Sequence, residues 1–328
     1  MMTLKEETIA AVCPVCRGGF EPAGQTLELG ETLRRWEQQL GSPLGEEVWR
    51  QYASNGSPRT VTLYRCGRCQ FALFQPVVTG SREFYEAITD QEGHCYTPEK
   101  WEFRQAVRDI RRHGCRNVLD IGSGSGHFLG VLRESCPDVE ASGFEFNPEM
   151  AALGRAKGHR VFEGQLPDAV LEGTGGKLFD AVCLFQVVEH VADPVGFIES
   201  ALRLLDEKGL LIIGVPDAAG PLRHFADDVS DVPPHHVSRW SEPVFRVGLR
   251  RLGLEVERVA YEPLPSYLWS FYLPEIVNKD LRPKVVGRAV NRLRLVPRLI
   301  RLLNFLGVKW LRGVPGHTVY AALRRSGK

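Results

Sequence analysis

The sequence predicts an α/β protein built on a doubly wound, mostly parallel sheet, with a small cysteine-bearing module before it. Three observations lead to this expectation: short apolar runs alternate with helical patterns after residue 100, a glycine-rich turn follows one of the runs, and two Cys-x-x-Cys pairs precede them all. Such alternation is typical of parallel sheets covered by helices on both faces. The 328 residues, 43% of them hydrophobic and 25% charged, suffice for one large domain and an appendage.

The chain divides into three predicted regions. Residues 1–80 form a metal-binding module, residues 81–261 and 314–328 form the α/β core, and residues 262–313 form a helical insert before the last strand. Predicted strands are 117–121, 141–146, 181–185, 210–215, 254–261 and 317–324, and predicted helices are 29–40, 97–113, 128–135, 148–157, 193–205 and 241–251.

The N-terminal segment and the overall hydropathy favour a cytosolic protein. Residues 1–10 contain Lys5, Glu6 and Glu7 and no apolar stretch, so we expect no signal peptide. No run of about 18 apolar residues occurs, so a membrane-spanning helix is not expected. In a reducing compartment the eight cysteines are expected to be thiols or metal ligands rather than disulfides.

Four of the cysteines form two pairs with the spacing of zinc ligands. Cys13 and Cys16 precede Cys66 and Cys69 by 49 intervening residues, and small or turn-forming residues surround each pair. Zinc in structural sites commonly takes four thiolates in a tetrahedron. A redox role needs a Cys-x-x-Cys at a helix N-terminus in a thioredoxin-like unit, which neither pair shows. The sequence therefore predicts one structural Zn²⁺, and the other cysteines receive no role.

A glycine-rich turn follows the strand at 117–121. Asp120 ends the strand, and Gly122, Gly124 and Gly126 alternate with Ser123 and Ser125 before a helix. Such a turn lets the backbone approach a ligand, and the helix N-terminus offers N–H donors to an anion. The dinucleotide pattern G-x-G-x-x-G lacks its third glycine in both registers, which disfavours NAD and FAD.

This Asp-x-Gly-x-Gly-x-Gly pattern resembles motif I of class I S-adenosylmethionine-dependent methyltransferases. Glu145 stands 19 residues after Gly126 at the end of the next strand, where a carboxylate can accept both ribose hydroxyls. Residues 164–167 and 179–191 resemble the adenine-enclosing segment and the fourth strand of the same family. The resemblance covers about residues 97–261 and the last strand, and it implies a Rossmann-like seven-stranded sheet, S-adenosylmethionine as cofactor, and binding by Asp120, Gly122, Ser123, Gly124, Gly126, Glu145, Phe146, Asn147, Gln165, Leu166, Phe185 and Gln186.

Three histidines are candidates for removing a proton from the acceptor. His190 follows the fourth strand, in a Glu-His-Val stretch that resembles quinone O-methyltransferases, and His235 and His236 lie in a loop that resembles the base-bearing loop of zinc-containing deoxysugar C-methyltransferases. His236 is the leading base. The alternatives are that His190 caps a helix and that His235 is a surface turn residue.

Upstream aromatic residues have two interpretations. Tyr85, Tyr96 and Trp101 lie in a segment that resembles the cap of zinc-ribbon methyltransferases from sugar and glycan pathways, so they could line the cofactor or acceptor pocket. They would be equally at home in the core.

The predicted activity is methyl transfer to a small molecule: a sugar nucleotide, another glycan precursor, or a lipid-linked or quinone-like compound. One alternative is a zinc-containing RNA methyltransferase, against which the formal charge of +1 argues. A second alternative is a non-catalytic binding protein with the same fold, against which the intact Asp120, glycine turn and Glu145 argue.

The insert is strongly basic. Residues 281–312 contain nine Lys or Arg and no Asp or Glu, which leaves about −8 for the remainder. Apolar residues alternate with basic ones at helical spacing, and Pro297 is expected to kink or divide the helix. The pattern indicates a membrane-surface helix, a lid over an anionic substrate, an RNA-binding face, or a packed subdomain. Its basic positions are Lys284, Arg288, Arg292, Arg294, Arg298 and Arg301.

Overall fold

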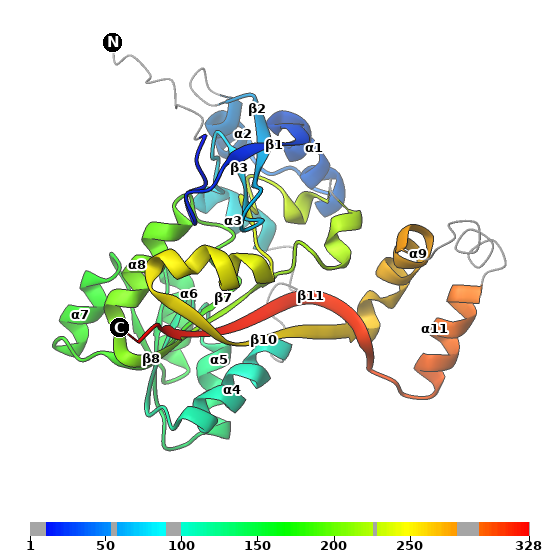
Figure 1. Cartoon of the computed structure of the whole chain (residues 1–328). Coiled ribbons are helices and arrows are strands. Elements are labelled where there is room, and N and C mark those ends of the chain that lie inside the picture. Colours follow the sequence, from blue (N-terminus) through cyan, green and yellow to red (C-terminus); the bar gives the residue numbers. More distant parts are fainter. Residues whose placement is uncertain (1–10, 54–57, 90–99, 226–227, 281–294, 328) are drawn as a thin grey trace, which may run out of the picture.

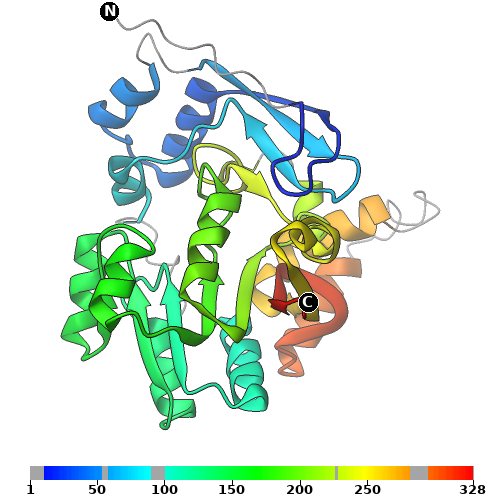
Figure 2. The same ribbon diagram turned by 60° about the vertical axis from the view of Figure 1, so that its left-hand side comes forward.

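The computed structural model describes residues 11–53, 58–89, 100–225, 228–280 and 295–327. The N-terminal module lies over one end of a central α/β core, and a pair of long strands leads from the core to two helices at its side (Figure 1). Figure 2 shows the module's strands and helices above the parallel strands of the core.

Within the described residues, the core sheet has seven strands in the order β10-β11-β8-β7-β4-β5-β6. The strands β8, β7, β4, β5 and β6 are parallel, whereas β11 is antiparallel to both β8 and β10. This topology confirms the predicted fold class. The strand bounds are β4 Asn117–Ile121, β5 Glu140–Phe144, β6 Arg160–Phe162, β7 Phe179–Phe185, β8 Leu205–Pro216, β10 Leu254–Pro265 and β11 Trp310–Arg325.

Helices cover both faces of the sheet because adjacent apolar residues of each strand point to opposite faces. Val118 of β4 packs with α4 and α5, whereas Leu119, the next residue, belongs to the cluster that includes residues of α7 and α8. The helix α6 packs at the edge, beside β6. The helix bounds are α4 Trp101–His113, α5 His127–Ser135, α6 Pro148–Ala156, α7 Asp168–Thr174 and α8 Pro194–Leu204.

The N-terminal module is tied to the core by a shared sheet. Its strands β1, β2 and β3 are joined by β9 (Ser238–Arg239), which the core contributes, in the order β1-β2-β3-β9. Leu73 of β3 pairs with Ser238 of β9. The module's elements are β1 Phe20–Glu28, α1 Leu29–Leu40, α2 Glu46–Ala53, β2 Thr60–Cys66, β3 Ala72–Gln75 and α3 Arg82–Thr89.

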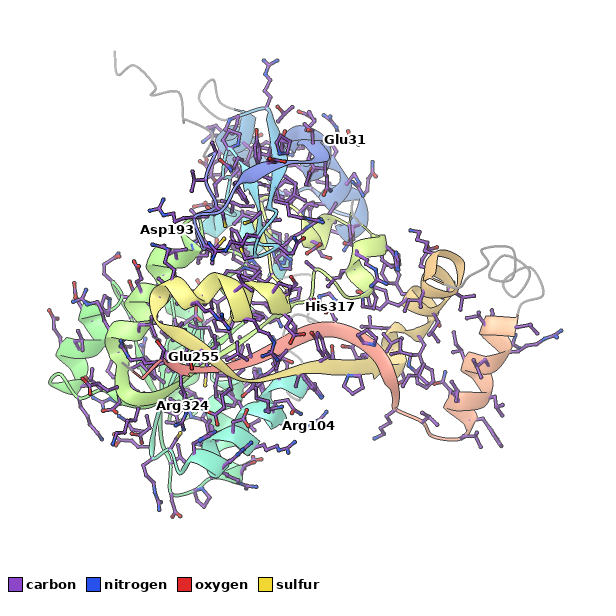
Figure 3. All side chains as sticks on the ribbon, viewed as in Figure 1. Glu31, Arg104, Asp193, Glu255, His317 and Arg324 are labelled. Carbon is purple, nitrogen blue, oxygen red and sulfur yellow. The ribbon has the colours of Figure 1, made fainter. Side chains whose placement is uncertain are left out.

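The last two strands are longer than predicted. β10 continues to Pro265 and β11 already begins at Trp310, because the two strands pair with each other beyond the part of β11 that pairs with β8. The part of β11 that pairs with β8 runs from Thr318 to Arg324. Figure 3 labels Arg324 and also His317, the residue before Thr318. The insert between the strands contains α9 (Trp269–Asp280) and α11 (Leu295–Phe305), with Pro297 in the first turn of α11.

One helix prediction needs correction, and the start of another lies outside the described residues. The helix predicted at 241–251 is a π-type turn, Val244–Gly248, followed by a 3₁₀ turn, Leu249–Leu252. Residues 97–99, at the predicted start of α4, lie outside the described residues, as do Tyr96 and the basic positions between 281 and 294.

Candidate active site

The glycine turn joins β4 to α5 and requires glycine. Gly122, Gly124 and Gly126 have φ values of 79°, 53° and 82°, in the left-handed region that side chains disfavour. A Cβ atom at Gly122 would also collide with the side chain of Val187, which follows β7. The turn is therefore packed tightly against the segment that leads to His190.

Two polar atoms at this turn are buried without a partner. Oδ1 of Asp120 and Oγ of Ser123 have no hydrogen-bond partner among the described residues. Burial, and secondarily the charge of Glu145, raises the pKa of Asp120 well above its ordinary value. A buried polar atom without a partner costs about 1–3 kcal/mol, so a ligand that supplied donors here would stabilise the site. A small cavity opens between Asp120, Gly122, Ser123, Phe128, Phe185, Lys100, Phe103 and His127.

Glu145 directly follows β5 and holds the glycine turn. Its Oε2 accepts a hydrogen bond of 2.7 Å from the amide of Gly124, and its Oε1 accepts one of 2.9 Å from the amide of Asn147. Burial raises the pKa of Glu145, although these amide donors oppose the shift. Each carboxylate oxygen retains a further lone pair with which to accept a hydroxyl.

The neighbouring predicted cofactor residues have diverse environments. Asn147 caps α6, since its Oδ1 accepts from the amides of Glu149 and Met150. Phe146 is 52% exposed and contacts Phe144 edge-on.

The remaining predicted cofactor residues lie after β6 and β7. Gln165 is exposed in the loop after β6, and Leu166 packs on the core. Phe185 lines the cavity, whereas Gln186 has a φ of 56° and donates a 3.2 Å hydrogen bond to Glu102.

Three histidines from two loops meet beyond the carboxyl ends of β7 and β8. His190 follows β7, and His235 and His236 precede β9. The ring centroid of His190 lies 4.7 Å from those of His235 and His236, which stack on each other at 4.5 Å. One ring nitrogen of each histidine lies within 4.8 Å of the others. The structure therefore brings together all three predicted catalytic residues.

The Nδ1 atoms of these histidines have different partners. Nδ1 of His190 lies 2.9 Å from the carbonyl oxygen of His235 and 3.1 Å from the hydroxyl of Tyr85. Nδ1 of His236 lies 3.2 Å from Oδ1 of Asp231. Nδ1 of His235 is buried and has no partner in the described parts of the chain. Because a carbonyl oxygen only accepts, the proton of His190 lies on Nδ1, which leaves its Nε2 as a free acceptor.

Burial keeps this cluster uncharged. It lowers the pKa of His190 to about 4 and the pKa values of His235 and His236 well below their ordinary value. The adjacent Glu189 is buried, and burial raises its pKa to about 8. Neither carboxylate oxygen of Glu189 has a partner within the described residues. Burial therefore favours the neutral forms of the three histidines and of Glu189.

Several neighbours of the site gave no signal in the sequence. Lys100, Phe103 and His127 line the cavity through the start of α4 and α5, and Asp231 reaches His236 from a short 3₁₀ turn, Val229–Asp231. Trp101 instead packs edge-on against Tyr320 in the core, as its alternative interpretation held.

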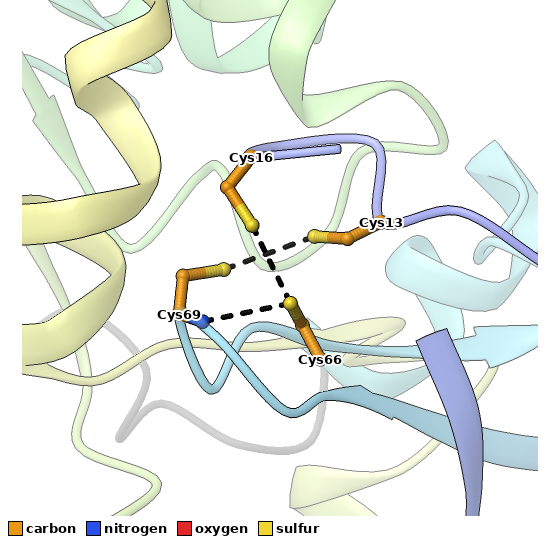
Figure 4. Close-up of side chains that lie close together, drawn as sticks. All are labelled: Cys13, Cys16, Cys66 and Cys69. Carbon is orange, nitrogen blue, oxygen red and sulfur yellow. Dashed lines mark hydrogen bonds between the residues drawn. The ribbon is translucent and has the colours of Figure 1, made fainter. Parts of the chain in front are cut away.

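The four cysteines of the module form a buried cluster (Figure 4). Sγ of Cys13 lies 3.8 Å from Sγ of Cys69, and Sγ of Cys16 lies 3.4 Å from Sγ of Cys66. All four sulfur atoms lie within 4.8 Å of one another. Four thiol sulfurs at these separations can surround one tetrahedral ion.

The two Cys-x-x-Cys loops have matching backbone conformations. In each loop the amide after the second cysteine donates a 3.0 Å hydrogen bond to the carbonyl of the first cysteine, from Arg17 to Cys13 and from Gln70 to Cys66. Arg17 and Gln70 also share a φ of 63°. Amides of Gly18 and Arg68 lie 3.4 Å from the sulfurs of Cys16 and Cys66, respectively. Donors directed at sulfur favour the thiolate form that binds metals.

Hydrogen bonds connect the module that carries the cysteine cluster to the core and to the loop that carries His235 and His236. The amide of Phe74 on β3 donates a 2.9 Å hydrogen bond to the carbonyl of Val237, the residue after His236. On the core side, the guanidinium of Arg251 donates to the carbonyls of Val15 and Pro14, at 3.0 and 3.1 Å. The module therefore supports the loop that carries two of the three histidines.

Comparison with known proteins identifies similar chains. A family model of the methyltransferase domain matches residues 90–259. Ubiquinone biosynthesis O-methyltransferase of Xanthomonas oryzae pv. oryzae is 29% identical over 191 residues, which cover 52% of this chain and 75% of that protein. Demethylmenaquinone methyltransferase of Deinococcus radiodurans is 32% identical over 116 residues, which cover 34% of this chain and 47% of that protein. A solved methyltransferase from Archaeoglobus fulgidus aligns with a TM-score of 0.42 and 22% identity over 67% of this chain and 93% of that chain.

Proposed function

The chain belongs to the methyltransferase-domain family and is an S-adenosylmethionine-dependent methyltransferase, and we propose that its acceptor is a sugar nucleotide, another glycan precursor, or a lipid-linked or quinone-like compound. The quinone methyltransferases among its relatives support the last of these classes.

One observation carries the proposal: the glycine turn touches the segment that bears the histidines. Gly122 packs so closely on Val187 that a Cβ atom at Gly122 would collide with its side chain. Val187 lies only three positions before His190. Ligands of open α/β sheets bind beyond the carboxyl ends of the strands, where both features lie. An acceptor held by the histidine cluster would therefore lie next to a cofactor held by the turn.

The residues at the turn fit the cofactor. Oδ1 of Asp120 and Oγ of Ser123, which have no partner in the described part of the chain, would receive its polar groups, and Glu145 would accept its ribose hydroxyls. When bound, S-adenosylmethionine supplies an electrophilic methyl group on a sulfonium. The chain would align the acceptor with this methyl group and keep water away, since Phe103, Phe128 and Phe185 enclose the turn.

The histidine cluster would take up the acceptor proton or orient the acceptor. Asp231 orients His236 through Nδ1, so its Nε2 is directed away from Asp231 as a proton acceptor, with His190 and His235 beside it. In many general-base sites a carboxylate binds the Nδ1–H of a histidine and so orients its Nε2 toward the substrate.

We also propose that the cysteine cluster of Cys13, Cys16, Cys66 and Cys69 holds one structural Zn²⁺. Its support is the sulfur geometry together with the matched backbone turns of the two loops. Because β3 holds the histidine loop, zinc would secure the active site as well as the module.

The described residues include no helix long and apolar enough to cross a membrane. The helix α11 nevertheless has an exposed apolar stripe, because Leu299 is 50% and Leu302 53% exposed while Val296 and Ile300 pack inward. Leu306, directly after the helix, is 63% exposed. Arg298 and Arg301 flank the stripe, and the helix has no acidic residue. It projects from the core beside α9 (Figure 1).

We propose that the exposed face of α11 docks on an anionic bilayer, where each basic residue contributes about 1 kcal/mol. Full-length protein is expected to sediment with phosphatidylserine-containing vesicles at low salt. A variant with Arg298 and Arg301 changed to Glu should stay in the supernatant. The control places the same changes at Arg108 and Arg112, which are exposed on α4. If neither wild type nor control sediments, the face is a lid or a packing surface instead.

The substrate class is tested by incubating the full chain with methyl-labelled S-adenosylmethionine and a small-molecule extract or RNA from its source organism. Label is expected in small molecules, identified by mass spectrometry, and Asp120→Asn is the inactive control. Transfer to RNA alone would support the RNA alternative, and cofactor binding without transfer to either fraction would support the binding-protein alternative.

A further inference from the structure

We infer that His190, His235 and His236 form a second metal site, which takes a divalent first-row transition ion, with Zn²⁺ the best-suited candidate. The inference deepens the proposed function, because it assigns how the acceptor is held. It rests on that function only for the identity of the acceptor.

The spacing of the ring nitrogens carries the first step. One nitrogen from each ring lies within 4.8 Å of the others, so small side-chain rotations bring three donors to the roughly 2 Å that zinc requires. The rings come from loops after two adjacent strands, β7 and β8, whose positions the parallel sheet fixes. Imidazole is a preferred ligand of zinc, iron, nickel and copper.

The second step is that the surroundings orient the rings as metal sites require. A ligating histidine almost always donates its other N–H to a carboxylate or a backbone carbonyl. His236 meets a carboxylate oxygen of Asp231 at 3.2 Å, and His190 meets the carbonyl of His235 at 2.9 Å. Both contacts use Nδ1, which leaves Nε2 of each ring as the ligand atom. Arg239 in turn holds Asp231, with 3.4 Å between its Nη2 and Oδ2.

The third step concerns His235. Its Nδ1 is buried and has no partner among the described residues. The ring is fixed between Trp36, Phe84 and Tyr85, all within 6.5 Å of its centroid. An ion between the rings would give this buried nitrogen a partner that the described residues do not supply.

Three protein ligands leave a coordination position open, as in catalytic rather than structural zinc sites. A hydroxyl of the acceptor fits this position. An ion held there would lower the pKa of that hydroxyl, so that its proton could be lost to solvent before methyl transfer. In the loaded protein His236 is then a ligand, and this revises its role as a free base.

The test counts metal in the full chain after zinc loading and desalting. Two equivalents are expected for the wild type, one in the cysteines and one in the histidines. A variant with His190→Gln and His236→Gln should hold one. The matched control is His113→Gln, in the last turn of α4 beside Glu257 of β10, which should hold two. One equivalent in both wild type and the double variant would overturn the inference.

A second measurement avoids variants that fail to fold. Wild type carrying one zinc is titrated with Co²⁺ and followed by absorption. A cobalt d–d band without a thiolate charge-transfer band is expected, because the cysteines already hold zinc. If cobalt binds only with thiolate bands, or not at all, the histidines hold no metal. Calorimetry of S-adenosylmethionine binding, run on the same samples, reports separately on the proposed function.

Discussion

Replacing Glu145 by Ala is expected to weaken S-adenosylmethionine binding about 5- to 150-fold. The carboxylate now accepts amide hydrogen bonds from Gly124 at 2.7 Å and Asn147 at 2.9 Å, and its remaining lone pairs face the cofactor side of the turn in our proposal. Hydrogen bonds to charged groups contribute about 1.5–3 kcal/mol each. A net loss of about 1–3 kcal/mol in binding gives the stated range.

The same change affects stability separately, because the amides of Gly124 and Asn147 lose their acceptor. Thermal unfolding without ligand measures this part, and calorimetry below the transition measures affinity. Glu149→Ala is the control, since that side chain is 71% exposed on α6. An affinity for Glu145→Ala equal to that of the control would remove Glu145 from the cofactor site.

Three further predictions concern the cysteines, the histidines and a buried carboxylate. Cys66→Ser should release one zinc equivalent and lower the melting temperature, measured by metal analysis and calorimetry, whereas Cys136→Ser, outside the cluster, should keep the zinc. His236→Ala should lower turnover by about 10²–10⁴ with cofactor affinity unchanged, and an unaltered rate constant would return His236 to a structural role. Burial raises the pKa of Glu262 from 4.5 to about 7, so the stability linked to it is present below pH 4.5 and is lost as the pH rises through 7. Glu262→Gln, which keeps an acceptor for the amides of His317 and Thr318, should therefore exceed wild type in unfolding free energy by up to about 3 kcal/mol at pH 8.5, with the difference shrinking toward pH 5. Equal denaturant curves at both pH values would contradict this.

The sequence by itself determined the parts that depend on local pattern. The predicted helix at 29–40 and strand at 117–121 coincide with α1 and β4. Apolar periodicity and capping residues act over a few positions, so they are visible without a structure. The glycine turn and the Cys-x-x-Cys loops could also be predicted from the sequence. A positive φ value favours glycine at a given position, and a pair of metal ligands requires two cysteines within one turn.

Only the tertiary structure decided how distant segments meet. His190 and His235 are 45 positions apart, and nothing local to either shows that their rings lie 4.7 Å from each other. The pairing of β3 with β9, which joins the cysteine module to the histidine loop, likewise connects segments with no shared pattern. The neutral state of the cluster is also tertiary, because burial by surrounding elements sets the pKa values. Local sequence fixes backbone conformation, whereas the packing of the whole chain fixes which side chains share a low-dielectric site.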